Sequence, residues 1–351
     1  MKVGGRSYRS LAVAEDGWSV EVVDQTRLPG EFVLTRLRTV EEAAAAIRTM
    51  QVRGAPLIGV TAAYGICLAL RADPSDAALA TADRVLGETR PTAINLRRAL
   101  SRMASVLREV PPGERAEAAY RLAAKLADED VGINERIGLH GERILRDLAG
   151  RKPSGQLNIL THCNAGWLAT VDWGTALAPV YRAHHAGIPT HVWVSETRPR
   201  NQGRLTAWEL AQEGVPYTLV VDSAAGLLLS LGKVDVVLVG ADRVTRGGDV
   251  ANKIGTYLKA LAAREAGVPF YVAAPSPSID WTLDRGEAVP IEERSADEVI
   301  ATPGTPVHNP GFDITPARLI TGLVTERGLG SASEAGLRGL FPEINPLPAP
   351  G

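Results

Sequence analysis

The feature that most constrains the fold is a regular alternation of short apolar runs and helical segments in the second half of the chain. The apolar runs are Leu157–His162, Thr190–Ser195, Tyr217–Val221, Val234–Gly240 and Phe270–Ala274. The helical segments between them are Thr175–Ala186, Leu205–Glu213, Ala224–Leu231 and Lys253–Ala266. Such alternation predicts consecutive β-α-β units that together form a parallel sheet.

The first half of the chain has a different pattern, a small β start followed by helices. The expected strands are Leu11–Ala14, Ser19–Val23 and Phe32–Thr35. The expected helices run from the N-cap Thr39 to about Met50, and over Leu57–Ala72, Ser75–Leu86, Pro91–Leu107 and one or more stretches of Pro112–Gly150. We therefore expect an α/β protein: a mainly helical N-terminal domain at 1–150, then a Rossmann-like catalytic domain at 151–351.

Composition excludes several classes of function. Of the 351 residues 45% are hydrophobic and 22% are charged, a composition typical of a globular protein. The net charge of −2 shows no excess of basic residues of the kind that nucleic-acid binding requires. We find no secretory signal and no run of the ~18 apolar residues that a membrane helix needs. Two cysteines fit a reducing cytosol, and the six histidines form no metal-binding pattern. The expected location is cytoplasmic, without membrane or nucleic-acid partners.

Polar residues follow four successive predicted strands, at Cys163, Gln202, Asp222 and Asp242. Ligands of parallel sheets bind beyond the carboxyl ends of the strands, so these groups should converge. After Asp242 comes a glycine-rich turn, and we expect Asn252 and Lys253 to open the next helix. This arrangement would place a carboxylate, an amide, an ammonium group and free helix N–H groups around a small anionic substrate.

Each of these residues also has a structural interpretation. A lone cysteine is more often a small buried hydrophobe, which is our interpretation of Cys67, but polar neighbours favour a functional role for Cys163. Asp242 could instead cap a local structure or pair with Arg243 or Lys253.

Two arginines of the first half are candidates for anion binding. Arg53, Gly54 and Ala55 precede a helix start, where a guanidinium and backbone N–H groups suit phosphate, although a surface turn is equally compatible. Arg90 precedes a Pro-started helix and could likewise be an ordinary surface arginine. Gln202 could lie at a loop tip or reach a sugar hydroxyl. The chain has neither a GxGxxG nor a GxxxxGK[ST] motif, which disfavours a nucleotide-dependent oxidoreductase.

Six separated motifs together resemble methylthioribose-1-phosphate isomerase, a family related to the regulatory subunits of initiation factor 2B. The motifs are Arg53–Pro56, His162–Gly166, Glu196–Pro199 with Gln202-Gly203, Gly240–Arg243 with Gly248-Asp249 and Asn252–Tyr257, Ile291–Arg294, and Asn309–Pro316. The resemblance extends roughly from Asp24 to Glu326.

The resemblance implies an enzyme of methionine salvage, and so of methionine biosynthesis, that isomerises 5-methylthioribose 1-phosphate to 5-methylthioribulose 1-phosphate. Asp242 matches the family's catalytic acid/base and Cys163 its catalytic cysteine. The matching substrate-binding positions are Arg53, Gly54, Ala55, Arg90, Gln202, Asn252 and Lys253. The resemblance also implies a homodimer, no metal or organic cofactor, and a site at the domain interface.

One departure leaves the substrate open. Family members often carry methionine or histidine after the third strand of the sheet, where this chain has the run Ala224–Leu229. The same isomerisation of 5-deoxyribose 1-phosphate or ribose 1,5-bisphosphate is therefore an alternative. A non-catalytic binding protein, like the regulatory subunits, is an alternative of another class.

Overall fold

The computed structural model describes residues 1–152, 155–299, 302 and 304–344. The chain divides into two compact units. Unit 1 comprises Met1–Asn134 and Gly166–Gly174, and unit 2 comprises Glu135–Ala165 and Thr175–Gly351. Pro153 and Ser154, in the linker at which we expect the domains to divide, lie outside the described residues, and the division at 150 and 151 stays a prediction.

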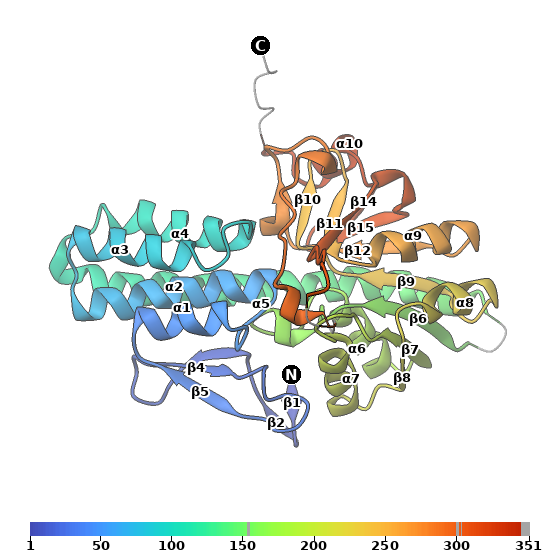
Figure 1. Cartoon of the computed structure of the whole chain (residues 1–351), viewed down its shortest axis with the longest axis horizontal. Coiled ribbons are helices and arrows are strands. Elements are labelled where there is room, and N and C mark those ends of the chain that lie inside the picture. The colour runs from blue at the N-terminus through green and yellow to red at the C-terminus, as the bar shows by residue number, and fades with distance from the viewer. Residues whose placement is uncertain (153–154, 300–301, 303, 345–351) are drawn as a thin grey trace, which may run out of the picture. The chain divides into compact units, whose positions relative to one another are not determined.

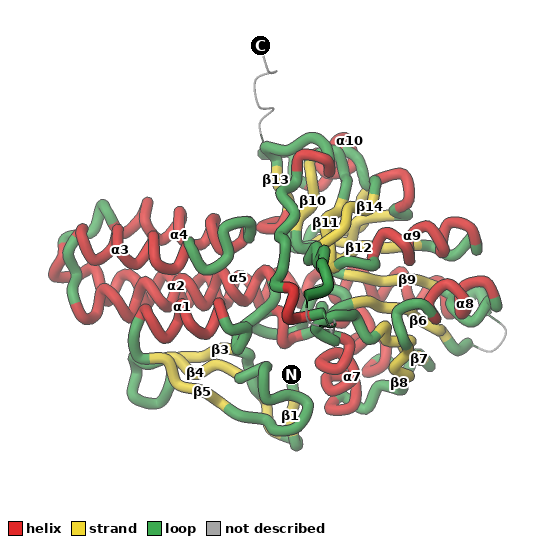
Figure 2. The backbone as a smooth tube through the Cα atoms, in the orientation of Figure 1, coloured by secondary structure: helices red, strands yellow, loops and turns green. Residues whose placement is uncertain are grey.

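Unit 1 is mainly helical after a small β start, as the sequence predicts (Figure 2). Its strands are β1 (Lys2–Val3), β2 (Arg6–Ser7), β3 (Leu11–Val13), β4 (Val20–Val23) and β5 (Leu34–Leu37), with β3, β4 and β5 in one antiparallel sheet. The helices are α1 (Val40–Arg48), α2 (Ala55–Ala72), α3 (Asp76–Gly87), α4 (Ile94–Leu107) and α5 (Pro112–Gly150), which ends in unit 2. Thr39 caps α1 as expected, because its hydroxyl accepts the Glu42 N–H at 3.2 Å.

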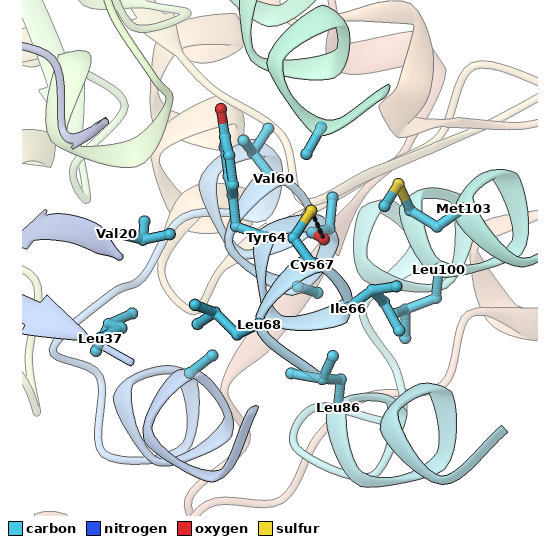
Figure 3. Close-up of a cluster of buried hydrophobic side chains, with 14 of the residues drawn as sticks. Val20, Leu37, Val60, Tyr64, Ile66, Cys67, Leu68, Leu86, Leu100 and Met103 are labelled. Carbon is cyan, nitrogen blue, oxygen red and sulfur yellow. Dashed lines mark hydrogen bonds between the residues drawn. The ribbon is translucent and has the colours of Figure 1, made fainter. Parts of the chain in front are cut away.

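Helix α2 is the centre of the hydrophobic core of unit 1 (Figure 3). It packs against α1, α3 and α4, and Cys67 on it is fully buried, with its thiol donating to the Ala63 carbonyl oxygen at 3.3 Å. The expectation of no membrane-length apolar segment was wrong, because α2 is long and apolar enough by length and composition to cross a membrane. However, 72% of that segment is buried inside the protein, as befits a core helix.

Unit 2 is built on a seven-stranded sheet in the order β16-β15-β12-β9-β6-β7-β8 (Figure 1). Its strands are β6 (Leu157–His162), β7 (Thr190–Ser195), β8 (Tyr217–Val220), β9 (Val236–Val239), β12 (Phe270–Ala273), β15 (Gly322–Thr325) and β16 (Gly328–Gly330). All pairs are parallel except β15 with β16. The parallel strands follow the Rossmann order, which reverses between β6 and β9. The predicted fold class is confirmed.

The helices of unit 2 alternate with its strands. They are α6 (Leu177–His185), α7 (Gly203–Gln212), α8 (Ala224–Ser230), α9 (Thr256–Glu265) and α10 (Glu334–Leu340). Short 3₁₀ helices are also present, at η1 (Trp167–Ala169, in unit 1), η2 (Ser276–Ser278), η3 (Gly286–Ala288), η4 (Ala296–Glu298) and η5 (Ala317–Leu319).

A second sheet of unit 2 contradicts one expectation from the sequence. Its strands are β13 (Ile279–Asp280), β10 (Arg243–Thr245), β11 (Val250–Lys253) and β14 (Phe312–Thr315), in that order. The glycine-rich turn reverses the chain, so β11 pairs antiparallel with β10 and with the distant β14. Asn252 and Lys253 therefore belong to a strand, and helix α9 begins only at Thr256.

Helix α4 also begins later than predicted, at Ile94 instead of Pro91. The Ala93 N–H donates to the Arg90 carbonyl oxygen at 3.0 Å, which closes a turn that has Pro91 at its second position. Arg90 therefore lies in a turn before the helix and not at the helix start.

Candidate active site

The loops after β6 and β9 lie side by side at the point where the strand order reverses. The Thr161 hydroxyl near the end of β6 donates to the Leu238 carbonyl oxygen of β9 at 2.8 Å. Beyond the strands, a Cβ added to Gly240 would lie 2.8 Å from the Ala165 Cβ, so only glycine allows this approach. Cys163 and Asp242 thus occupy loops in mutual contact, at the position where Rossmann-type sheets bind ligands.

Cys163 has its backbone fixed from two sides. Its φ of 69° is in the left-handed region, which residues other than glycine rarely adopt. The Cys163 N–H donates to Thr197 Oγ1 at 2.8 Å, and its carbonyl oxygen accepts from Thr206 Oγ1 at 2.8 Å. The residue is partly exposed, unlike Cys67.

Asp222, two residues beyond the end of β8, organises the loop after β7. Its carboxylate accepts the N–H groups of Thr197 at 2.8 Å and Arg198 at 2.7 Å, and the hydroxyl of Ser195. Burial opposes ionisation, but these hydrogen bonds and the charge of Lys259 keep the pKa of Asp222 below its ordinary value. Asp222 is therefore a carboxylate that holds loop backbone in place.

His162 and Lys259 lie beside Asp222 in the interior of unit 2. Burial, with the charge of Lys259, lowers the pKa of His162 to about 3, so its imidazole is neutral. His162 Nε2 is 2.8 Å from the Ile254 carbonyl oxygen, which can only accept, so Nε2 carries the proton. Lys259 is 3% exposed with Nζ 4.0 Å from Asp222 Oδ1, and burial lowers its pKa.

The start of helix α9 does not offer the free N–H groups that we expected for an anion. The Asp313 carboxylate of β14 accepts the Gly255 N–H at 2.7 Å and the Tyr257 N–H at 3.1 Å. Burial raises the pKa of Asp313 to about 6, although these two hydrogen bonds oppose the rise. The chain's own carboxylate thus satisfies this helix end, and the expectation was wrong.

Asn252 and Lys253 project to opposite faces of β11, because successive residues of a strand alternate. Asn252 is buried, and its side-chain amide donates to Thr256 Oγ1 at 3.0 Å. Lys253 is half-buried, with Nζ 4.9 Å from the centre of the Phe312 ring. A shared contact of the two side chains with one substrate group is therefore not expected.

Gln202 is the N-cap residue of α7 and is buried, with 7% of its surface exposed. Its side-chain oxygen, also buried, has no hydrogen-bond partner among the described residues. Buried amide oxygens are normally hydrogen-bonded, so this oxygen is suited to accept from a ligand hydroxyl.

Asp242 lies between β9 and β10, two residues beyond the contact of Gly240 with Ala165. Its backbone N–H donates to the Ala251 carbonyl oxygen of β11 at 3.0 Å, and the residue is partly exposed. The backbone that carries the Asp242 carboxyl group thus connects a strand of one sheet of unit 2 with a strand of the other, and a hydrogen bond to β11 holds it in place.

The remaining predicted substrate-binding residues lie in unit 1. Gly54 is the N-cap of α2 with φ of 101°, and an added Cβ would lie 2.4 Å from the Ala169 Cα, so the position requires glycine. Arg53 before it is buried, with 9% exposed, and Ala55 is the first residue of α2. Arg53, Gly54 and Ala55 therefore do lie at a helix start, as predicted.

Several residues that support this site were not identified from the sequence. Thr206 and Glu209 on α7 accept from the Asn164 side-chain amide at 3.2 and 2.8 Å, and Tyr181 donates to Glu209 at 2.6 Å. Their only sequence signal is polar residues on the buried face of a helix. Among the described residues, no group of three or more His, Cys, Asp or Glu side chains is placed to hold a metal ion.

The fold and the site together define a class, an α/β protein with a thiol and a carboxyl group at the strand reversal of a Rossmann-ordered sheet. A family model described as the Initiation factor 2 subunit family matches residues 51–331. The methylthioribose-1-phosphate isomerase of Brucella anthropi is 57% identical over 98% of this chain and 100% of its own length. The chain therefore belongs to the Initiation factor 2 subunit family and, within it, to the methylthioribose-1-phosphate isomerase family.

Solved structures agree with this assignment. The crystal structure of 5-methylthioribose 1-phosphate isomerase from Pyrococcus horikoshii OT3 is similar with a TM-score of 0.86 and 41% identity, covering 97% of each chain. That of translation initiation factor eIF-2B, subunit delta, from A. fulgidus is similar with a TM-score of 0.82 and 40% identity, over 96% of this chain and 100% of the other.

Proposed function

We propose that the protein is an aldose–ketose isomerase that converts 5-methylthioribose 1-phosphate to 5-methylthioribulose 1-phosphate in methionine salvage. The observation that carries the proposal is the pair of Cys163 and Asp242 on contacting loops at the strand reversal. Relatives that align over their full length and carry the isomerase name support the same activity.

The reaction explains why two groups that can carry protons are required. Because the anomeric oxygen of the substrate carries a phosphoryl group, the sugar ring cannot open to a free aldehyde. The ring oxygen must be protonated as its bond to C1 breaks, a hydrogen must move from C2 to C1, and the C2 hydroxyl must lose its proton to give the ketone. The atoms balance without any oxidant or reductant, so no redox cofactor is needed.

In this proposal Asp242 acts as the general acid or base that transfers a proton at the ring oxygen or the C2 hydroxyl. Cys163 transfers a second proton or stabilises the ring-opened intermediate. General acid–base help of this kind contributes ~10²–10⁴-fold in rate. Arg53, Arg90 and Lys253 bind the phosphate, with the backbone of Gly54 and Ala55, and Gln202 and Asn252 bind sugar hydroxyls. These assignments stay predictions.

The substrate is tested by comparing turnover of 5-methylthioribose 1-phosphate, 5-deoxyribose 1-phosphate and ribose 1,5-bisphosphate. We expect the highest kcat/KM for the methylthio sugar, and a lower value for the bisphosphate, whose second phosphate would need a further basic cluster. A higher kcat/KM for 5-deoxyribose 1-phosphate would assign the same chemistry to another sugar. Absence of turnover with all three would contradict the proposed activity.

A second candidate is a non-catalytic regulatory subunit, which the similarity to the eIF-2B delta structure favours. Such a subunit has no need of a thiol and a carboxyl group on contacting loops, so we prefer the enzyme. Binding of the sugar phosphate without any isomerisation would reverse this preference.

We further propose a cytoplasmic homodimer. Strand β8 at the edge of the main sheet exposes Tyr217 and Leu219, and Leu227 on α8 and Leu231 at the C-cap of α8 are each 60% exposed. Large apolar side chains exposed on two successive elements of the chain support a subunit interface in this region. Analytical ultracentrifugation at micromolar concentration should give a mass twice that of one chain. A mass equal to one chain would contradict the proposed homodimer.

A further inference from the structure

Thr197 is a strained residue that no proposed catalytic or substrate-binding role accounts for. It has φ of 67°, and a left-handed conformation is a genuine outlier for a β-branched residue. Cys163, 34 positions earlier in the chain, has nearly the same strained φ of 69°. Backbone strain persists only where the surroundings enforce it, and such residues cluster at functional sites.

A hydrogen bond joins the two strained residues. The Cys163 N–H donates to Thr197 Oγ1 at 2.8 Å. The hydroxyl proton of Thr197 is directed to the Ser195 carbonyl oxygen at 2.9 Å, so the lone pairs of Oγ1 are available to accept. The side-chain oxygen of Thr197 therefore fixes the backbone from which the Cys163 thiol projects.

Asp222 fixes Thr197 in turn. Its two carboxylate oxygens accept the consecutive N–H groups of Thr197 and Arg198, at 2.8 and 2.7 Å, and this pair of bonds defines the backbone conformation at Thr197. Lys259, with Nζ 4.0 Å away, lies beside the carboxylate in the protein interior. The chain of contacts thus runs from a buried ammonium group through a carboxylate and a hydroxyl to Cys163.

On the other side, helix α7 completes the support. Thr206 donates to the Cys163 carbonyl oxygen at 2.8 Å, and the fully buried Glu209 holds the side chain of Asn164. Both backbone polar groups of Cys163 are therefore bonded to threonine hydroxyls from two different segments. This arrangement fixes the direction of the Cα–Cβ bond of Cys163, from which the thiol projects.

From these contacts we propose that Thr197 is a positioning residue, held by Asp222, whose hydroxyl fixes the strained backbone of Cys163 and thereby aims its thiol at the reacting sugar. The inference rests on the proposed function only in that Cys163 takes part in catalysis. The position of the thiol matters because a misplacement of a reacting group by about 1 Å can lower the rate ~10²-fold.

The decisive variants remove the hydroxyl in two ways. Thr197→Val keeps the shape, and Thr197→Gly relieves the backbone strain of a positive φ. Thr197→Ser keeps the hydroxyl, and Thr218→Val, at an exposed position of β8, controls for the Thr-to-Val change. With 5-methylthioribose 1-phosphate, we expect Thr197→Val and Thr197→Gly to lose ~10–100-fold in kcat with little change in KM. Thr197→Ser should retain most of the wild-type kcat.

A second measurement needs no substrate. The chain has two cysteines, so selective ¹⁵N-cysteine labelling gives two amide resonances, with the Cys67 amide in α2 as internal reference. In Thr197→Val the Cys163 amide proton should move upfield and exchange with solvent about fivefold faster, the ratio expected for loss of one hydrogen bond. Thr197→Ser and Thr218→Val should leave both amides unchanged.

The two measurements separate failure of this inference from failure of the proposed function. An unchanged Cys163 amide in both Thr197→Val and Thr197→Gly overturns the inference whether or not the enzyme is active. So does a kcat within about threefold of wild type in these variants, or a loss in Thr197→Ser as large as in Thr197→Val. A shifted amide in a protein that isomerises none of the sugar phosphates overturns the proposed function, and with it the catalytic purpose of the positioning, but leaves the hydrogen bond between Cys163 and Thr197 in place.

Discussion

The two cysteines of this chain lie in regions built on opposite physical principles. Cys67 is on a buried helix among apolar side chains, where burial raises the pKa of its thiol well above the ordinary value (Figure 3). Cys163 is in a loop, partly exposed, with a strained backbone that hydrogen bonds hold from two sides. The helical core is stabilised by apolar burial, whereas the strand ends of unit 2 depend on polar networks, which tolerate less substitution.

The largest expected effect is a contrast between the carboxyl groups of Asp242 and Asp249, which are seven positions apart: one should affect catalysis and the other stability. Asp242→Asn should lower kcat by ~10²–10⁴-fold, because an amide cannot exchange the proton, and should leave the free energy of unfolding nearly unchanged. Asp249→Asn should do the reverse, since the Asp249 carboxylate accepts the N–H groups of Gly286 at 2.8 Å and Ala317 at 2.9 Å. An amide cannot accept both, so we expect a loss of about 1–3 kcal/mol in unfolding free energy.

Steady-state kinetics and urea titration of both variants test this contrast. Near-normal kcat in Asp242→Asn would show that the proposed acid/base is misassigned. A stable Asp249→Asn protein with little activity would instead place Asp249 in the chemistry.

The cysteines themselves give the next contrast. Cys163→Ser should lose activity by ~10²-fold or more, because a hydroxyl is a much weaker acid than a thiol, with little change in stability. Cys67→Ser should stay active but lose about 1–3 kcal/mol of unfolding free energy, because a hydroxyl enters an apolar core. The melting temperature and kcat of each variant measure the two effects, and the contrast fails if both variants change the same property.

The smallest expected effect is an opposite pH dependence of the contributions that two buried groups, His162 in unit 2 and Asp130 in unit 1, make to stability. In unit 2 the pKa of His162 is lowered to about 3 by burial, so the stability from keeping it neutral is present above pH 6.5 and lost as pH falls toward 3. In unit 1 burial raises the pKa of Asp130 to about 7 although it accepts the Val171 N–H at 2.7 Å. The folded state therefore binds more protons between about pH 4 and 7, and stability falls as pH rises through that window.

Asp130→Asn and His162→Gln test these signs in urea titrations at pH 4–8. Relative to wild type, Asp130→Asn should gain stability as pH rises, by at most about 1.4 kcal/mol per pH unit. His162→Gln should instead gain as pH falls below 6.5. Parallel pH profiles for wild type and both variants would mean that neither group changes protonation on unfolding.

The sequence by itself determined the fold class, five of the six parallel strands and the loops that carry Cys163, Gln202 and Asp242, but not the parallel strand β15. This was possible because strand–helix periodicity and strand-end polarity are local patterns that a parallel sheet converts directly into position. The family resemblance, carried by separated short motifs, is confirmed by relatives aligned over the whole chain. The roles of the individual site residues stay predictions.

Only the tertiary structure decided what lies around Asn252 and Lys253. The local sequence predicted that both residues belong to a helix, but pairing with β14, about sixty positions later, makes them part of a strand. The same pairing allows the Asp313 carboxylate to accept the Gly255 N–H at the start of the helix that follows. Likewise, no local pattern indicates that Thr197 holds the backbone of Cys163, or that Asp222 holds Thr197. Such contacts join residues distant in sequence through single hydrogen bonds, whose geometry exists only once the strands have been placed side by side.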